Sequence, residues 1–220
     1  MARLPTVEEC FNILNDNQVP FHIIKHSIMV ARVGLTLAMA LKESRPSHEG
    51  LDIELVAVAC LLHDVKKMEC IEHGCDHAEV GSDYLNALGL PDVASLVRQH
   101  YRLDPENKDF SRIKEVHLLY YADNRVKHHE IVDIDERFED LIERYGRDKR
   151  TIRDLRMRLE ETKELEKRLF SVLTFGPDAL KEEVLNGESD HFLGPLGLSH
   201  RDLAKKEHLN RSVARQSTGT

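Results

Sequence analysis

Apolar residues recur every three to four positions along most of this chain, and no clear run alternates apolar with polar residues. Such spacing is typical of amphipathic α-helices, whereas strict alternation is typical of β-strands. Proline, glycine and capping residues mark where the periodic segments begin and end. The pattern predicts an all-α fold with helices over residues 7–15, 21–43, 53–67, 77–88, 91–101, 111–128, about 133–146 and 148–174.

The length of 220 residues suits one domain of ordinary size with an appendage. We expect a helical domain over 1–130, a C-terminal helical extension packed on it over 131–200, and a polar, basic tail over 201–220. The segment 148–174 mixes basic and acidic residues, which is typical of a solvated or packing helix. Formation of a homodimer through that helix is a further hypothesis.

The formal net charge of −8 argues against a nucleic-acid-binding surface as the main function. No stretch approaches the roughly 20 apolar residues that span a bilayer, so no membrane contact is expected. Because residues 1–5 include no apolar signal core, we expect a cytoplasmic location. The four cysteines show no paired framework, and Cys10 and Cys60 are predicted to be core thiols because they lie in apolar helical patterns.

Five of the predicted helices carry histidine or aspartate on or beside their apolar face. Side chains at positions i, i+3, i+4 and i+7 share one face, so these polar groups should point toward the core. The groups are His26, His63 with Asp64 beside it, His77, His100 and Asp123. A single inward histidine is most often a hydrogen-bonded core residue. Four imidazoles and two carboxylates in one interior would repel each other or stay unsatisfied, so the set predicts a metal site.

The other histidines have simpler interpretations. Seven fall in loops or on mixed helix faces, where the surface is the expected position: His48, His117, His128, His129, His191, His200 and His208. His73 with Cys70, Cys75 and His77 forms a weaker zinc candidate, because its spacing is tighter than that of a standard zinc finger.

The segment from about 21 to 128 resembles the HD superfamily of metal-dependent phosphohydrolases. His26, in the run Lys-His-Ser, resembles the first histidine of that family. His63 and Asp64, in the run Leu-Leu-His-Asp, resemble its signature doublet, and Asp123, preceded by Ala122, resembles its last aspartate. The resemblance implies an HD-domain helical bundle, here with additional C-terminal helices.

Two further histidines resemble additions found in branches of this family that bind two metals. His77 is followed four residues later by Gly81, and His100 follows in the run Val-Arg-Gln-His. With the four residues above, they imply the six-ligand, two-metal form. Four imidazoles and two carboxylates favour iron or manganese, with magnesium, cobalt, nickel or zinc as alternatives.

The resemblance implies a hydrolase that cleaves a phosphoester or phosphoanhydride of a nucleotide or dinucleotide by a metal-bound hydroxide. The expected partner is therefore a nucleotide-like phosphorylated small molecule. Asp64 and Lys67 are the predicted catalytic residues: Asp64 would bridge the metals, and Lys67 would bind phosphate or stabilise charge. The alternative for Lys67 is an ordinary solvated lysine at a helix C-terminus.

Two other functions remain open at this point. One is a one-metal 5′-nucleotide monophosphatase, in which His77 and His100 would surround the metal without binding it. The other is a non-catalytic regulatory module that senses a nucleotide, with the charged helix 148–174 as a partner surface.

Overall fold

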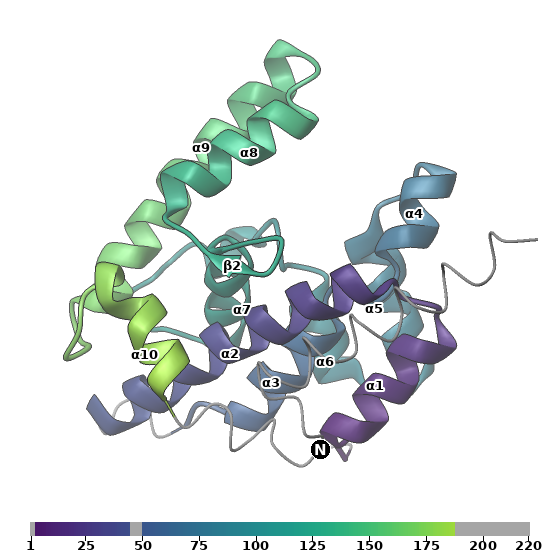
Figure 1. Cartoon of the computed structure of the whole chain (residues 1–220), viewed down its shortest axis with the longest axis horizontal. Helices are drawn as coiled ribbons and strands as arrows, with labels where there is room; N and C mark the ends of the chain where they lie inside the picture. Colours follow the sequence, from purple (N-terminus) through teal and green to yellow (C-terminus); the bar gives the residue numbers. More distant parts are fainter. Residues whose placement is uncertain (1–2, 45–49, 188–220) are drawn as a thin grey trace, which may run out of the picture.

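The structure, a computed structural model, describes residues 3–44 and 50–187. Its regular elements are almost all helical, which confirms the predicted all-α fold (Figure 1). In chain order they are α1 (Val7–Asp16), α2 (Phe21–Ser44), α3 (Ile53–Leu62), α4 (Lys67–His73), α5 (His77–Ala87), α6 (Pro91–Val97), the 3-10 helix η2 (Pro105–Asn107), α7 (Glu115–Asp123), strands β1 (Val126–Lys127) and β2 (Glu130–Ile131), α8 (Ile134–Tyr145), α9 (Lys149–Phe170), the 3-10 helix η3 (Pro177–Ala179) and α10 (Leu180–Asn186).

Capping side chains explain why several helices begin where the sequence predicts. Thr6 and Glu9 form a capping box at α1, in which each side chain accepts a hydrogen bond from the other residue's backbone N–H. An aspartate accepts first-turn N–H groups at α3, α5, α8 and α9: Asp52, Asp76, Asp133 and Asp148 respectively. Each such cap contributes about 0.5–2 kcal/mol, enough to select a starting residue.

Helix α2 runs through the middle of the molecule, against α3 and α7. By length and composition alone α2 could cross a membrane, but 72% of its most apolar window is buried inside the protein. Its apolarity therefore has an explanation in core packing. Cys10 and Cys60 are buried and unpaired in this core, which confirms them as core thiols.

Gly34 allows α2 and α3 to approach closely. A Cβ atom at this position would lie 2.8 Å from Cys60 Sγ and 3.1 Å from Val56 Cγ1. We predict that Gly34→Ala lowers the free energy of unfolding by about 1–3 kcal/mol, the usual cost of overpacking. Urea titration would measure this change. Gly176→Ala is the control because its Cβ would meet no atom within 4 Å; equal stability of the two variants would contradict the packing account.

Four predicted helices end four or five residues earlier than expected, and those predicted over 91–101 and 148–174 stop at Val97 and Phe170. The helix predicted over 53–67 stops at Leu62. After a turn, α4 begins at Lys67, although no helix was predicted between residues 67 and 77. The helix predicted over 111–128 is shorter at both ends. Beyond its C-terminal end the chain forms the hairpin β1–β2 around His128, whose φ is 57°. Two-residue strands do not produce a readable alternation of apolar and polar residues, so the sequence pattern missed them.

His117 is fully buried, so its predicted surface position is wrong. The loop before α7 folds over the ring: the Lys114 N–H donates to His117 Nδ1, and His117 Nε2 donates to the Asn107 carbonyl at 2.9 Å. Burial lowers the pKa of His117 below 6.5, the ordinary value for histidine. His128 and His129 are exposed as predicted, whereas His48, His191, His200, His208 and the predicted tail 201–220 lie outside the described residues.

The buried His117 predicts a pH dependence of stability. Below pH 6.5 the unfolded chain takes up a proton on this histidine that the folded chain resists, so stability falls as pH falls. The loss reaches at most about 1.4 kcal/mol per pH unit, down to the folded pKa. Chemical unfolding of wild type and His117→Gln at pH 7.5 and 5.5 should therefore show the steeper loss in wild type. Parallel losses would contradict this origin.

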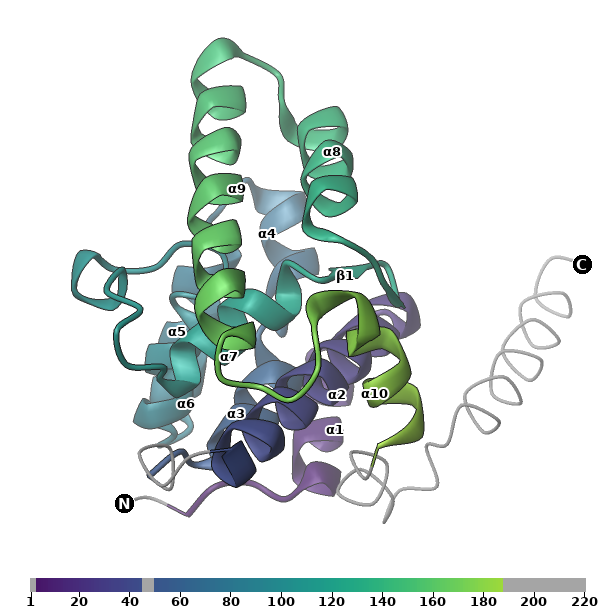
Figure 2. The same cartoon turned by 90° about the vertical axis from the view of Figure 1, so that its left-hand side faces the viewer.

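Helices α8 and α9 form an antiparallel arm that projects from the rest of the molecule (Figure 2). Arg125, which the sequence analysis did not select, is buried beneath the arm's base. Its guanidinium donates to Glu166 of α9 at 2.9 Å and to the Val132 and Pro177 carbonyls. Arg125 thus holds α9 and the two flanking segments together. The predicted domain boundary near residue 130 remains a prediction.

Candidate metal centre

The structure brings all six predicted ligands together. His26 comes from α2, Asp123 from the last residue of α7, and His77 from the first residue of α5. His63, Asp64 and His100 follow the C-terminal ends of α3 and α6. All of them are buried except His77, whose side chain is 26% exposed.

Asp64 lies between two groups of histidines. Its Oδ2 atom is 3.4 Å from His63 Nε2 and 4.0 Å from His26 Nε2. Its Oδ1 atom is 3.4 Å from His77 Nε2 and 3.8 Å from His100 Nε2. The ligand atoms of His26, His63 and Asp64 lie within 4.8 Å of one another, as do those of Asp64, His77 and His100. One carboxylate therefore belongs to two separate candidate metal sites.

Asp123 completes the first of these groups. Its Oδ1 atom is 2.9 Å from His26 Nε2 and 3.7 Å from His63 Nε2. Arg137 of α8 approaches the same oxygen at 3.8 Å. This guanidinium partly balances the charge of the carboxylate from the side of the arm.

Backbone carbonyls fix the orientation of three of the histidines. The Nδ1 atoms donate to carbonyl oxygens at 2.7–2.9 Å: His26 to His128, His63 to Cys60, and His100 to Val97. A carbonyl can only accept, so in the neutral ring the lone pair is on Nε2, which faces the centre. Such an outer hydrogen bond is the usual support of a metal-bound histidine.

The same bonds explain why α3 and α6 end where they do. His63 and His100 each bond the carbonyl three residues earlier, which a continuing helix would use itself. The Val65 N–H turns instead to the Leu62 carbonyl at 3.1 Å. At both places, the hydrogen bond that ends the helix also orients the histidine ring toward the centre.

The arrangement of donors fits divalent metal ions. Among the described residues, His63 Nε2 and Asp64 Oδ1 are buried without a hydrogen-bond partner. Leaving such buried groups without a partner costs several kcal/mol. His77 Nε2 and His100 Nε2 lie 3.1 Å apart, at hydrogen-bond distance, and both face the centre. Cations held by this set of nitrogen and oxygen atoms would satisfy all of these groups.

The carboxylates are held in the ionised form that metal binding requires. Burial alone would raise the pKa of Asp64, but the positive charges of Lys67 and His63 keep it well below its ordinary value. Burial also opposes ionisation of Asp123, but the close contact with His26 and the charge of His63 again lower its pKa well below the ordinary value. Both groups are therefore available as anionic ligands at neutral pH.

The histidines differ in their affinity for protons. Burial, with the charges of His77 and His63, lowers the pKa of His100 to about 3. Burial also lowers the pKa of His26. In His63, burial is outweighed by the charge of Asp64, so its pKa is raised. Metal binding should displace a proton from His63, because a ligand nitrogen must be deprotonated.

Lys67 lies at the start of α4, not on α3 as predicted, but it does reach the centre. Its Nζ atom is 2.7 Å from Asp64 Oδ2. Burial would lower the pKa of Lys67, but the charge of Asp64 raises it. The amine is therefore a permanent positive charge beside the candidate bridging carboxylate.

Two hollows open onto the centre. The first, of about 350 Å³, is bordered by His26, Asp64, the hairpin turn at His128 and His129, and the exposed Ile71 of α4. The second, of about 250 Å³, is bordered by the candidate ligands His77, His100 and Asp123 and by residues of α9. The residues common to both are Lys67, Arg137, Arg144 and Tyr145. Together the two hollows form a cleft across the centre beneath the arm.

The arm residues of this cleft were missed by the sequence analysis. Arg137 and Arg144 come from α8, and Arg158 comes from α9. A signal existed for Arg137, because it shares the buried face of α8 with Ile134 and Leu141. The test that selected the inward histidines would have found it if arginine had been included.

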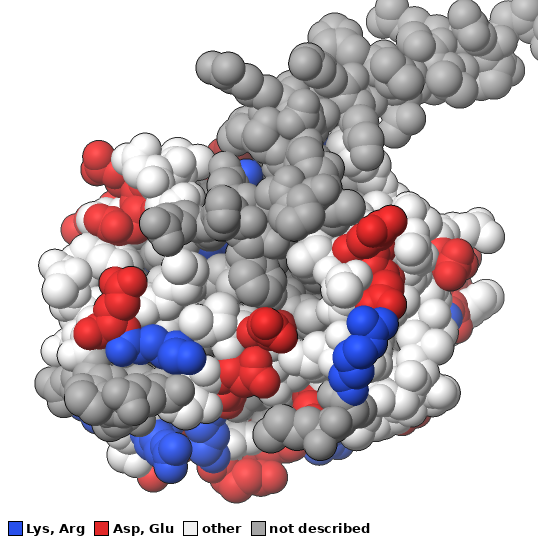
Figure 3. Space-filling model, turned by 90° about the horizontal axis from the view of Figure 1, so that it is seen from below, with Lys and Arg blue, Asp and Glu red and all other residues white. Residues whose placement is uncertain are grey.

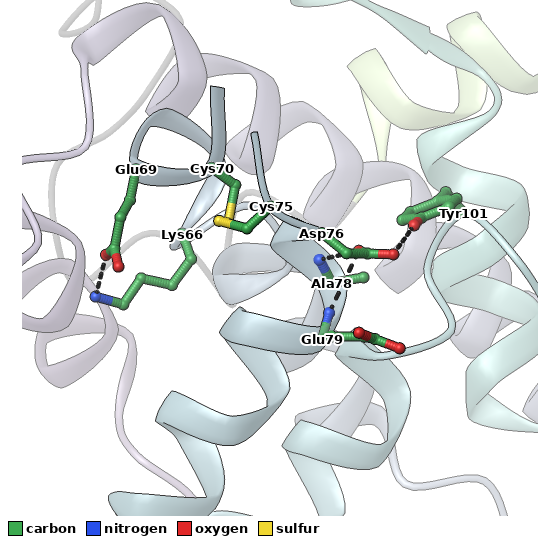
Figure 4. Close-up of a disulfide and its surroundings, with 8 residues drawn as sticks. All are labelled: Lys66, Glu69, Cys70, Cys75, Asp76, Ala78, Glu79 and Tyr101. Carbon is green, nitrogen blue, oxygen red and sulfur yellow. Dashed lines mark hydrogen bonds and ion pairs between the residues drawn. A yellow bond between two sulfur atoms is a disulfide. The ribbon is translucent and has the colours of Figure 1, made fainter. Parts of the chain in front are cut away.

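Cys70 and Cys75 form a disulfide, so the prediction that no cysteines pair is wrong (Figure 4). The unexpected helix α4 and the left-handed Gly74, with φ 70°, return the chain on itself between them. Disulfide sulfurs are not thiolate ligands, which argues against the zinc candidate containing His73. Asp76, next to Cys75, caps α5 and accepts from the Tyr101 hydroxyl, which fixes the start of the helix at His77.

Comparisons with known proteins agree with this geometry. The model of the HD domain matches residues 23–172, a range that contains all six candidate ligands and the arm. The "Uncharacterized protein MJ0778" of Methanocaldococcus jannaschii is 27% identical over 158 residues, covering 66% of this chain and 90% of that protein. No solved structure matches the chain. Because the family model covers more than half of the sequence and spans the converging histidines and aspartates, this chain belongs to the HD-domain family.

Proposed function

We propose that this protein is a two-metal phosphohydrolase that cleaves a phosphoester or phosphoanhydride of a nucleotide or dinucleotide. HD-domain proteins are generally metal-dependent hydrolases that bind divalent metals. The observation that carries the two-metal form is the position of Asp64, whose two oxygens face different histidine groups at 3.4–4.0 Å. A one-metal phosphatase has no use for His77 and His100 at such distances from Asp64.

The nitrogen and oxygen donors divide into two groups, one for each proposed metal ion. His26, His63, Asp64 and Asp123 would hold one ion, and Asp64, His77 and His100 would hold the other. When bound, two divalent ions supply Lewis acidity toward a phosphoryl oxygen and lower the pKa of a water molecule to near neutrality. Iron and manganese remain the proposed metals, because this mixture of imidazole and carboxylate ligands suits them.

The protein's own residues would prepare the site for a phosphate anion. Lys67 faces both hollows from beside Asp64, where its amine can hold a phosphoryl oxygen once metals take over the charge of Asp64. The carbonyls bonded to His26, His63 and His100 keep the ligand nitrogens in place without reorganisation. Because most of the centre is buried, bulk water is kept away and these charges act at full strength.

The experiment is a turnover assay of the manganese- or iron-loaded protein. Dinucleoside polyphosphates, cyclic dinucleotides and nucleoside monophosphates would be tested under saturating metal, with products separated by chromatography. We expect release of a phosphorylated product from at least one class, and none from protein treated with chelator. Metal-loaded protein that binds a nucleotide tightly but returns it intact would refute the hydrolase and favour the sensing module.

A further inference from the structure

The charged side chains that line the cleft are mostly positive. Lys67, Arg137 and Arg144 border both hollows, and Arg158 borders the second. Within the part of the chain that the structure describes, no glutamate borders either hollow, and the only carboxylates there are candidate metal ligands. The face away from the arm is different, since acidic and basic side chains lie beside each other on it (Figure 3). The cleft is therefore built for an anion.

Arg158 differs from the other cations of the second hollow. Lys67 is paired with Asp64 at 2.7 Å, and Arg144 is paired with Asp140 at 2.7 Å. Arg137 shares Asp140 at 3.2 Å. Over residues 3–44 and 50–187, Arg158 has no carboxylate within ion-pair distance. Its Nε atom, like that of Arg137, is buried without a hydrogen-bond partner.

Aromatic rings hold this unpaired guanidinium in place. It lies 5.5 Å from the centroid of the Tyr101 ring and 5.7 Å from that of Phe138. The Tyr101 ring in turn stacks on the His77 ring at 5.5 Å with an interplanar angle of 20°, and its hydroxyl donates to Asp76. Arg158 is thus fixed one aromatic ring away from a candidate metal ligand, on the side of His77 and His100.

We infer that Arg158, with Arg144, which also borders the second hollow, forms a subsite for a phosphate group of the substrate other than the one that is attacked. A planar guanidinium with free N–H groups binds phosphate oxygens in pairs. The reacting phosphate belongs at the metals and Lys67, so a second anion-binding group beyond His77 has no role for a substrate with a single phosphate. The inference rests on the proposed function and narrows its substrate to compounds with two or more phosphates.

The test measures binding, so it does not depend on turnover. The manganese-loaded 220-residue chain would be titrated calorimetrically with orthophosphate and with methylenediphosphonate, which carries two phosphorus groups that cannot be hydrolysed. Arg158→Met keeps the length of the side chain between Tyr101 and Phe138 but removes its charge. We expect the Kd for methylenediphosphonate to rise about tenfold or more, the effect of losing a charged hydrogen bond, and the Kd for orthophosphate to change less than twofold.

The controls separate binding from folding and from metal capture. Arg156→Met alters an exposed arginine of α9 that does not border the cleft, and it should leave both Kd values unchanged. Because the probes also bind manganese in solution, all titrations use the same concentration of free manganese. Arg158→Lys, which keeps the positive charge, should recover part of the affinity for methylenediphosphonate. If Arg158→Met weakens both probes equally, or neither, the subsite is refuted. A selective loss in a protein that hydrolyses no nucleotide would uphold the subsite while rejecting the proposed function.

Discussion

Asp64→Asn should abolish both metal binding at full stoichiometry and phosphohydrolase activity. The amide keeps one oxygen acceptor but loses the negative charge, so it cannot serve the His26–His63 group and the His77–His100 group together. We expect activity to fall at least on the order of 10³-fold, the upper range for removal of one key electrostatic group. Elemental analysis and turnover of the same preparation would measure both effects.

The matched control for this variant is Asp83→Asn. Asp83 is an exposed aspartate of α5, the helix that also supplies His77. The Asp83→Asn variant should retain the metal content and activity of wild type. An Asp64→Asn protein that keeps both metals, or more than about a tenth of the activity, would show that Asp64 is not shared between the ions.

Removal of the metal ions should lower the free energy of unfolding more than any other change considered above. Without cations, His63 Nε2 and Asp64 Oδ1 stay buried without a partner. Metal at 100 times its Kd should add about 2.7 kcal/mol per site to the free energy of unfolding. For a chain of this size that corresponds to a rise in Tm of roughly 5–10 °C per site. Thermal unfolding of chelator-treated protein, before and after manganese is restored, would measure the shift.

Variants of single histidines show whether the stabilisation comes from the centre. His100→Gln should lose a large part of the manganese-dependent rise in Tm. His73→Gln, at an exposed histidine of α4, should keep the whole rise. A rise that depended on His73 and not on His100 would mean that metal stabilises the protein at another place.

Much of the fold followed from local rules that act within a few residues. Thr6, Asp52, Asp76, Asp133 and Asp148 cap helices whose starts agree with the prediction. Helix ends were harder, because they depend on partners distant from the capping pattern. The end of α3 is set by the His63 imidazole, which bonds the Cys60 carbonyl while its other nitrogen faces the centre. Helical periodicity does not reveal that bond.

The geometry of the site was also predictable in part. Inward position on an apolar face was a sufficient test to find His26, His77, His100 and Asp123, and the structure brings these residues together. Their role as metal ligands stays a prediction. The test cannot find residues whose place depends on long-range packing, which is why His117 was assigned to the surface.

The position of the arm helix α9 depends on packing that lies far away in the sequence. The mixed charges of 148–174 predicted a solvated or packing helix, and α9 does expose much of its surface. Its inner face nevertheless brings Leu155 and Arg158 to the second hollow. Which face of a charged helix meets a cleft depends on the α8–α9 hairpin and on Arg125 at its base.

In the proposed centre, Asp64 joins two metal ions that are held by separate pairs of histidines. The most direct measurement is the number of metal ions per chain, determined by elemental analysis of protein purified without chelators, loaded with manganese and desalted. We predict two ions per chain in wild type and one in a His77→Ala, His100→Ala double variant. One ion per chain in wild type, unchanged in the double variant, would contradict the account.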